Sequence, residues 1–216
     1  KGYIQFEQPF WDVVKEAETS SSGAQVTHQV AASLLPAPYL KQYIWDNYQF
    51  VGQITQLTES KATVTDIGMG LLMGVKAWGI SPKNIYQGMA LHALLDPSID
   101  LVILTGPAGC GKTLLAMAAA LELTIEKGHY ERVIVTRNTP EIAESIGFLP
   151  GTEEEKMMPW LASVTDTLEV LHKKDNERQS SMEYVMEKAN IQFKSVNFMR
   201  GRSLQNTFVL LDECQN

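Results

Sequence analysis

The chain has 216 residues, of which 44% are hydrophobic and 20% are charged. These values are close to the averages of soluble globular proteins, so they exclude a disordered or fibrous chain. The net charge of −7 argues against a generally basic nucleic-acid coat, because phosphate contacts need lysine and arginine. Any nucleic-acid site must therefore be a local patch.

This length suits one main domain with an appendage. The longest apolar run, residues 114–123, is too short to span a bilayer and contains Glu122, so no membrane contact is expected. Cys110 and Cys214 do not resemble a secreted disulfide framework, which favours a cytoplasmic location. The chain starts at Lys1 and has no leader pattern, as expected of a fragment or a processed chain.

The first 66 residues predict two segments without identifiable chemistry. Residues 1–35 read as a linker around one short helix at 11–17, because residues 19–23 are a run of loop formers. Residues 36–66 are rich in Tyr, Ile, Val and Thr, and they predict a small antiparallel β module with strands at 41–45, 50–57 and 62–66.

Residues 67–216 predict an α/β domain in which helices cover a parallel sheet. Residues 101–105 are a continuous apolar run, as expected of a strand buried on both faces. A helix at 113–127 follows and is closed by Gly128. Further strands are expected at 132–136, 191–196 and 208–211, and further helices at 89–95 and 159–171.

The segment at 106–113 has the pattern G-x-x-x-x-G-K-T, between the expected strand and the expected helix. Such a loop turns its backbone N–H groups toward phosphate oxygens, and the following helix directs its positive end at them. The Lys112 ammonium would reach the β- and γ-phosphates, and the Thr113 hydroxyl would ligate Mg²⁺. The segment predicts a site for Mg-ATP formed by Gly106, Pro107, Ala108, Gly109, Cys110, Gly111, Lys112 and Thr113.

A second motif follows about a hundred residues later, where the apolar run 208–211 leads to Asp212 and Glu213. Beside the phosphate loop, Asp212 would hold Mg²⁺ together with Thr113, and Glu213 would orient and deprotonate the attacking water. Glu213 and Lys112 are therefore the expected catalytic residues. Taken alone, two acids after an apolar strand are often an ordinary strand end. The adjacent carboxylates favour hydrolysis over phosphorylation of a small metabolite.

Several further side chains have two readings each. Gln87 stands near the start of an expected helix, where its amide would read the adenine edge, or it is an ordinary exposed glutamine. Arg137 follows an expected strand, and Arg200 and Arg202 flank a glycine. These arginines would contact RNA or the ATP of a neighbouring subunit, or they pair with acids at 153–155.

These motifs together resemble the PhoH-like ATPases, relatives of superfamily 1 helicases. The similar segments include GPAGCGKTLLAMAAALE, GFLPGTEEEKMMPWL, MRGRSL and VLLDECQN, and the resemblance covers residues 78–216. It implies a RecA-like P-loop NTPase fold, an ATP-driven activity on single-stranded RNA and a homo-oligomeric ring. It also assigns Gln87 to adenine and adds Gln215 as a γ-phosphate sensor. The β module before it is similar to longer members, in which a PIN ribonuclease domain precedes the ATPase.

The resulting expectation is an RNA-stimulated ATPase or helicase that acts in RNA metabolism, linked to a ribonuclease outside this chain. The alternative is an ATP-gated assembly or adaptor protein whose turnover is incidental. Because the chain stops soon after Glu213 and lacks the family's later motifs, we expect it to bind ATP but to hydrolyse it poorly.

Overall fold

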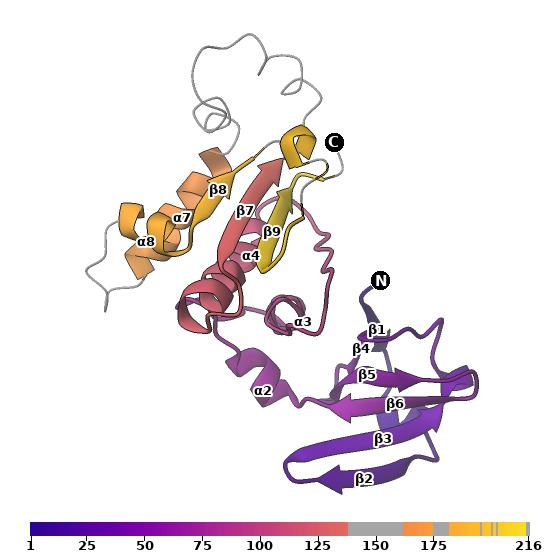
Figure 1. The fold of residues 1–216 in the computed structure, drawn as a ribbon. Helices are drawn as coiled ribbons and strands as arrows, with labels where there is room; N and C mark the ends of the chain where they lie inside the picture. The colour runs from indigo at the N-terminus through magenta and orange to yellow at the C-terminus, as the bar shows by residue number, and fades with distance from the viewer. Residues whose placement is uncertain (138–161, 175–181, 195, 200, 202, 215–216) are drawn as a thin grey trace. The chain divides into compact units, whose positions relative to one another are not determined.

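The computed structural model describes residues 1–137, 162–174, 182–194, 196–199, 201 and 203–214 (Figure 1). The chain divides into two compact units. The first comprises Lys1–Val75 with Lys83–Met89, and the second comprises Lys76–Pro82 with Ala90–Asn216. Helix α3 (Ile85–Leu94) therefore begins in the first unit and ends in the second.

The first unit contains a six-stranded sheet in the order β1-β4-β5-β6-β3-β2. Strands β1 and β4 are parallel, and the other neighbours are antiparallel. Phe10 is fully buried and packs with Ile44, Ile54 and Val64 in the core against one face of this sheet. The elements are β1 (Tyr3–Phe6), α1 (Phe10–Val13), β2 (Glu18–Ser22), β3 (Gln25–Ala31), a 3-10 turn (Ala32–Leu34), β4 (Tyr43–Asp46), β5 (Val51–Leu57), β6 (Lys61–Asp66) and α2 (Met69–Gly74).

The structure confirms the three strands predicted between residues 41 and 66, but the linker predicted at 1–35 is wrong. That segment supplies β1, β2 and β3, and its short helix is α1. Strand β2 consists of residues that usually form loops, and all five are exposed. It pairs along its length with β3 at the edge of the sheet, and such pairing between strands overrides local propensity.

The second unit is a mixed α/β structure, which confirms a parallel sheet with helices packed beside it. Strands β7 (Arg132–Arg137), β8 (Ile191–Phe193) and β9 (Thr207–Asp212) run parallel in the order β8-β7-β9. Helix α4 (Lys112–Leu121) continues as a π-helical turn (Glu122–Glu126) and is buried over most of its length. The other helical elements are α7 (Ala162–Lys174), α8 (Met182–Lys188) and a 3-10 turn (Val196–Met199).

One predicted strand of this unit is absent. Residues 101–105 form no strand, and the side chains of Leu101 and Ile103 are 75% and 69% exposed. An apolar run becomes a buried strand only when a neighbour supplies its ladder hydrogen bonds, and the described sheet pairs β9 with β7 alone. Strand β8 also ends earlier than predicted, because Val196 begins a 3-10 turn.

The predicted start of the helix at 159–171 lies outside the described residues, and the helix is seen from Ala162 onward. Within the described ranges, no helix has the length and apolar character needed to cross a bilayer.

Candidate functional site

The loop between residues 106 and 111 has the backbone geometry of a phosphate cradle. Gly109 and Gly111 have φ values of 75° and 90°, a left-handed region that disfavours any residue with a Cβ atom. Gly111 caps helix α4, which begins at Lys112. The unpaired N–H groups at the start of α4 therefore adjoin the loop, and a helix start of this kind attracts anions.

The Lys112 side chain lies against the loop itself. Its Nζ atom donates hydrogen bonds to the carbonyl oxygens of Gly106 at 2.9 Å and Pro107 at 3.0 Å, and it lies 3.8 Å from the Sγ atom of Cys110. A Cβ atom on Gly106 would come within 3.0 Å of the same sulfur. The Lys112 ammonium group is thus bonded to the backbone of the loop, whose residues 106–109 remain exposed.

Thr113 connects the phosphate loop to the second motif. Its Oγ1 atom donates a hydrogen bond of 3.0 Å to Oδ1 of Asp212, a residue 99 positions away, and the contact is half-buried. Asp212 is also the register partner of Arg137, so the last residues of β9 and β7 lie together at the carboxyl edge of the sheet. The structure brings together the hydroxyl and the carboxylate that were predicted to share a metal ion.

These two oxygen ligands fit Mg²⁺, which prefers hard oxygen donors and is usually held by one or two protein oxygens together with substrate phosphates. The described part of the chain holds no cluster of three or more His, Cys, Asp or Glu side chains suited to a metal. The site would therefore rely on phosphate oxygens to complete the coordination of the ion.

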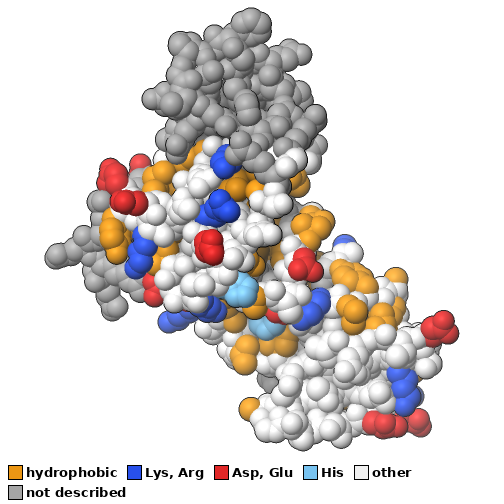
Figure 2. All heavy atoms as spheres, viewed as in Figure 1, with side chains coloured by type: hydrophobic (Ala, Val, Ile, Leu, Met, Phe, Trp, Pro, Cys, Tyr) orange, Lys and Arg blue, Asp and Glu red, His pale blue; other side chains and the backbone are white. Residues whose placement is uncertain are grey.

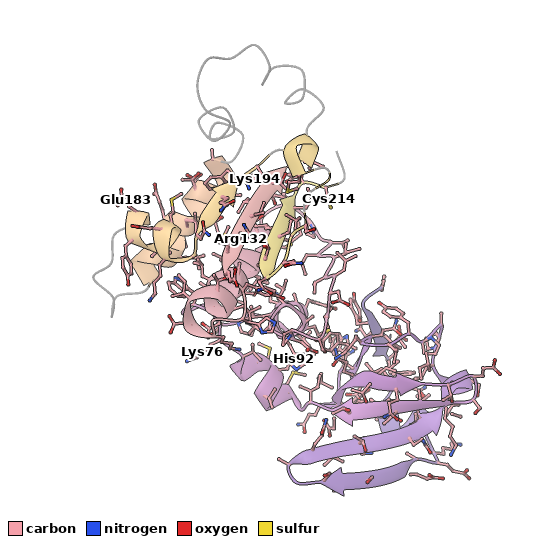
Figure 3. The ribbon with its side chains drawn as sticks, in the orientation of Figure 1. Lys76, His92, Arg132, Glu183, Lys194 and Cys214 are labelled. Atoms are coloured by element: carbon pink, nitrogen blue, oxygen red, sulfur yellow. The ribbon has the colours of Figure 1, made fainter. Side chains whose placement is uncertain are left out.

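Glu213 follows Asp212 in a strained backbone conformation. Its φ is 52°, in the left-handed region that a glutamate rarely occupies, and its side chain is half-buried. Such strain costs about 1–3 kcal/mol and clusters at functional sites. The chain then turns, so that Cys214 is exposed just beyond β9 (Figure 3).

Lys194 is a residue that the motifs did not single out. It directly follows β8, and its backbone N–H donates to the carbonyl of Val135 in β7 at 3.1 Å. Because β8, β7 and β9 are parallel, Lys194 belongs to the same carboxyl edge as Asp212 (Figure 3). The sequence signal that could have identified Lys194 is its position directly after a strand of the parallel sheet.

Gln87 has a structural role that the motif analysis missed. Its Oε1 atom accepts a 2.8 Å hydrogen bond from the N–H of Lys83, and its own N–H donates to Oδ1 of Asn84 at 3.0 Å. This reciprocal pattern is a cap at the start of α3, and the spacing N-x-x-Q was the signal for it. Gln87 belongs to the first unit, whereas the phosphate loop belongs to the second.

Three predicted site residues, Gln215, Arg200 and Arg202, lie outside the described residues, as do the acids at 153–155. For Arg137 the description is of the backbone alone, which ends β7 beside Asp212.

Comparison with known proteins agrees with this geometry. The family model described as PhoH-like protein matches residues 79–216, from before the phosphate loop to beyond Glu213. The chain belongs to the PhoH-like family. It is therefore a nucleotide-binding protein of the P-loop kind.

Curated PhoH-like relatives match the same part of the chain. Protein PhoH2 of Bacillus subtilis is 43% identical over 141 residues, which are 64% of this chain and 31% of that protein. A PhoH-like protein of Bacillus subtilis is 42% identical over 118 residues, 54% of this chain and 35% of its own length. A PhoH-like protein of Mycobacterium leprae is 36% identical over 158 residues, 73% of this chain and 42% of its own length.

The chain thus spans about a third of the length of the first two relatives. No solved structure matches it. The family match begins at residue 79, so the six-stranded sheet of the first unit lies before it.

Proposed function

We propose that the second unit is a Mg²⁺-dependent ATP-hydrolysing site of RecA-like fold, stimulated by single-stranded RNA. The observation that carries the proposal is the 3.0 Å hydrogen bond between Thr113 Oγ1 and Asp212 Oδ1. It joins the phosphate loop to the acidic motif across the carboxyl edge of a parallel sheet, where α/β proteins bind their ligands.

Each side chain of the site would have one task. Lys112 would exchange the carbonyls of Gly106 and Pro107 for the β- and γ-phosphate oxygens. Thr113 and Asp212 would hold the Mg²⁺ ion, which neutralises phosphate charge when bound. Glu213 would take a proton from water as the water oxygen bonds to the γ-phosphorus and the bond from that phosphorus to ADP breaks.

Two glutamines would complete nucleotide recognition. Gln87 would hydrogen-bond to the adenine edge with the amide group of the same side chain that caps α3. Gln215 would respond to the γ-phosphate, as the family resemblance implies.

RNA would bind through local cations rather than through the acidic protein as a whole. Lys194 and Arg137 stand at the carboxyl edge, and Arg200 and Arg202 precede β9 in sequence. In the longer protein, the motor would act in cytoplasmic RNA metabolism and pass RNA to a ribonuclease partner or a fused PIN domain.

The test is ATP turnover with and without single-stranded RNA in the longer protein of which this chain is a part. Glu213→Gln should bind Mg-ATP but lower turnover by about 10²- to 10⁴-fold, the usual contribution of a general base. Glu169→Gln, an exposed residue on α7, is the matched control and should leave turnover unchanged. Full turnover by Glu213→Gln would refute the assignment of the general base. A rate of ATP turnover that RNA does not increase would refute the RNA-stimulated activity.

A second candidate is an ATP-gated homo-oligomer, such as a ring, in which nucleotide binding controls assembly. Exposed apolar side chains in the second unit favour it, because such surface is typical of interaction sites. Leu101 and Ile103 precede the phosphate loop, and Val209 and Leu211 on β9 are 40% and 44% exposed. A rise in mass on addition of Mg-ATP, without affinity for RNA, would favour assembly over the motor.

A further inference from the structure

The sheet of the first unit has two faces of different chemistry. Alternation along the strands puts Ile4, Ile44 and Val64 on the inner face with the core. Their neighbours in sequence occupy the outer face, which carries aromatic, hydroxyl and amide side chains. The outer-face residues include Tyr3, Gln5, Tyr43, Trp45, Val51, Gln53, Thr55, Thr63, Thr65, Thr27 and Gln29, of which Tyr43, Trp45, Val51 and Gln53 are buried.

Carboxylates are nearly absent from this outer face. Asp46 and Asp66 fall on the inner face by the same alternation, and Asp46 is buried, where it accepts hydrogen bonds from backbone N–H groups. Glu18 on the edge strand β2 lies 3.8 Å from Lys61. Figure 2 shows little charge on the visible surface around β5, β6 and β3.

Three tyrosines mark the end of this face where β1 begins, and we call them the tyrosine platform: Tyr3, Tyr39 and Tyr86. The rings of Tyr3 and Tyr86 have centroids 5.2 Å apart, and Tyr86 also packs edge-on against Trp45 at 5.8 Å. Tyr39 and Tyr86 remain 45% and 46% exposed.

The exposed rings are held in place before any ligand arrives. The Tyr39 hydroxyl donates to the carbonyl oxygen of Lys1 at 2.7 Å, and Tyr86 is fixed between Tyr3 and Trp45. Burial raises the pKa of both Tyr39 and Tyr86, so their hydroxyls stay neutral. Pre-ordered rings lose little side-chain entropy on binding, which favours their use as stacking surfaces.

Charge at the platform is positive. The Lys1 ammonium lies 6.0 Å from the centroid of the Tyr3 ring, and Lys41 follows Tyr39 by two residues. Acidic residues outnumber lysines in the first 75 residues. The strand registers nevertheless place no acidic residue on the outer face of β1, β4 or β5. Neutral rings flanked by cations complement a chain of bases linked by phosphates.

We propose that the tyrosine platform binds single-stranded RNA, with successive bases stacked on Tyr86 and Tyr39 and the backbone near Lys1 and Lys41. The choice of RNA as the nucleic acid rests on the proposed function. The half-exposed hydroxyl and amide groups of Thr27, Gln29 and Thr63 on the outer face would meet base edges beyond the rings. The first unit would thereby bind the RNA while the second unit hydrolyses ATP.

The test uses the whole chain and a fluorescein-labelled oligouridine of about twelve nucleotides, near the usual length of such sites. Fluorescence anisotropy gives Kd for the wild type, Tyr86→Leu and Tyr39→Leu. Each leucine variant should weaken binding by about tenfold, and the double variant by about a hundredfold, the range expected for loss of base stacking. Tyr86→Phe keeps the ring and should bind like the wild type.

Tyr48→Leu is the matched control, because Tyr48 is 57% exposed in the same unit but lies in the turn after β4. It should leave Kd unchanged. Circular dichroism verifies that each variant is folded, and Tyr86→Phe separates loss of the ring from loss of packing. Replacing both Lys1 and Lys41 with alanine should make the slope of log Kobs against log salt shallower by about 1.4.

Equal Kd values for the wild type and the double leucine variant would overturn the platform, as would no binding by the wild type or a salt slope that the lysine replacements leave unchanged. Failure of the platform is distinguishable from failure of the ATPase. If RNA stimulates ATP turnover but the tyrosine variants bind normally, the platform alone is wrong. If the tyrosine variants lose RNA but the longer protein never hydrolyses ATP, the proposed function is wrong and the platform stands.

Discussion

The hydrogen bond from Thr113 to Asp212 gives a prediction that needs no ligand. Thr113→Val removes the donor with little change in shape, and Asp212→Asn removes the charge of the acceptor. A hydrogen bond to a charged group contributes about 1.5–3 kcal/mol. This contact is only half-buried, so solvent screening reduces the expected coupling to about 1 kcal/mol.

A double-mutant cycle measures this coupling. Urea unfolding followed by circular dichroism gives the free energy of unfolding of the wild type, both single variants and the double variant. The double variant should be more stable than the sum of the single losses implies, by about 1 kcal/mol. Additive losses, within about 0.3 kcal/mol, would mean that the two side chains do not interact and that the loop is not joined to β9.

The same variants link stability to nucleotide binding. Mg-ATP at a hundred times its Kd should stabilise the wild type by about 2.7 kcal/mol. Thr113→Val and Asp212→Asn should each reduce this gain, because the first loses an oxygen ligand of the proposed metal site and the second replaces a charged ligand with a neutral one. An undiminished gain in both variants would show that the ion is held elsewhere.

Three further predictions concern single positions. Gly111→Ala should lower the free energy of unfolding by about 1–2 kcal/mol and weaken nucleotide binding, because alanine is strained at φ 90°. An unchanged free energy of unfolding in urea would contradict the left-handed backbone conformation at this position. Glu122→Ala should lower the free energy of unfolding by about 1–3 kcal/mol, since Glu122 Oε2 accepts a hydrogen bond from the backbone N–H of the buried Trp78 at 3.0 Å. Glu122→Gln keeps an acceptor and should lower it less. Equal losses of stability in the two variants would refute the contact. Burial lowers the pKa of His28 below 6.5, with Asp66 partly opposing the shift, so the unfolded state binds protons more readily and stability should fall as pH drops below 6.5. Urea unfolding at pH 7.5 and pH 5 should show a larger loss in the wild type than in His28→Leu, and equal losses would contradict the shift.

The nucleotide site could be predicted because its signals are local. The spacing from Gly106 to Thr113 defines a loop on its own, and the apolar run before Asp212 defines a strand that ends in an acid. The structure joins these segments through one hydrogen bond. The left-handed backbone of Glu213 has no such signal, because glutamate ordinarily avoids that region.

The first unit was hard to predict because its order depends on pairing between distant strands. Residues 18–22 are polar on both faces, as suits an edge strand. They form a strand because they pair with β3, and that pairing has no signal within residues 18–22 themselves. Residues 101–105 show the opposite error. Their apolar run is typical of a buried strand, yet Leu101 is 75% exposed, because no described strand pairs with the segment.

The most direct test of the nucleotide site is calorimetric titration of the chain with a non-hydrolysable ATP analogue in the presence and absence of Mg²⁺. The wild type should bind one equivalent in a Mg²⁺-dependent manner. Lys112→Ala should abolish binding, while Lys127→Ala, which removes an exposed ammonium beyond the end of α4, should preserve it. Binding that survives Lys112→Ala, or that takes no notice of Mg²⁺, would contradict a site formed by this loop together with Asp212.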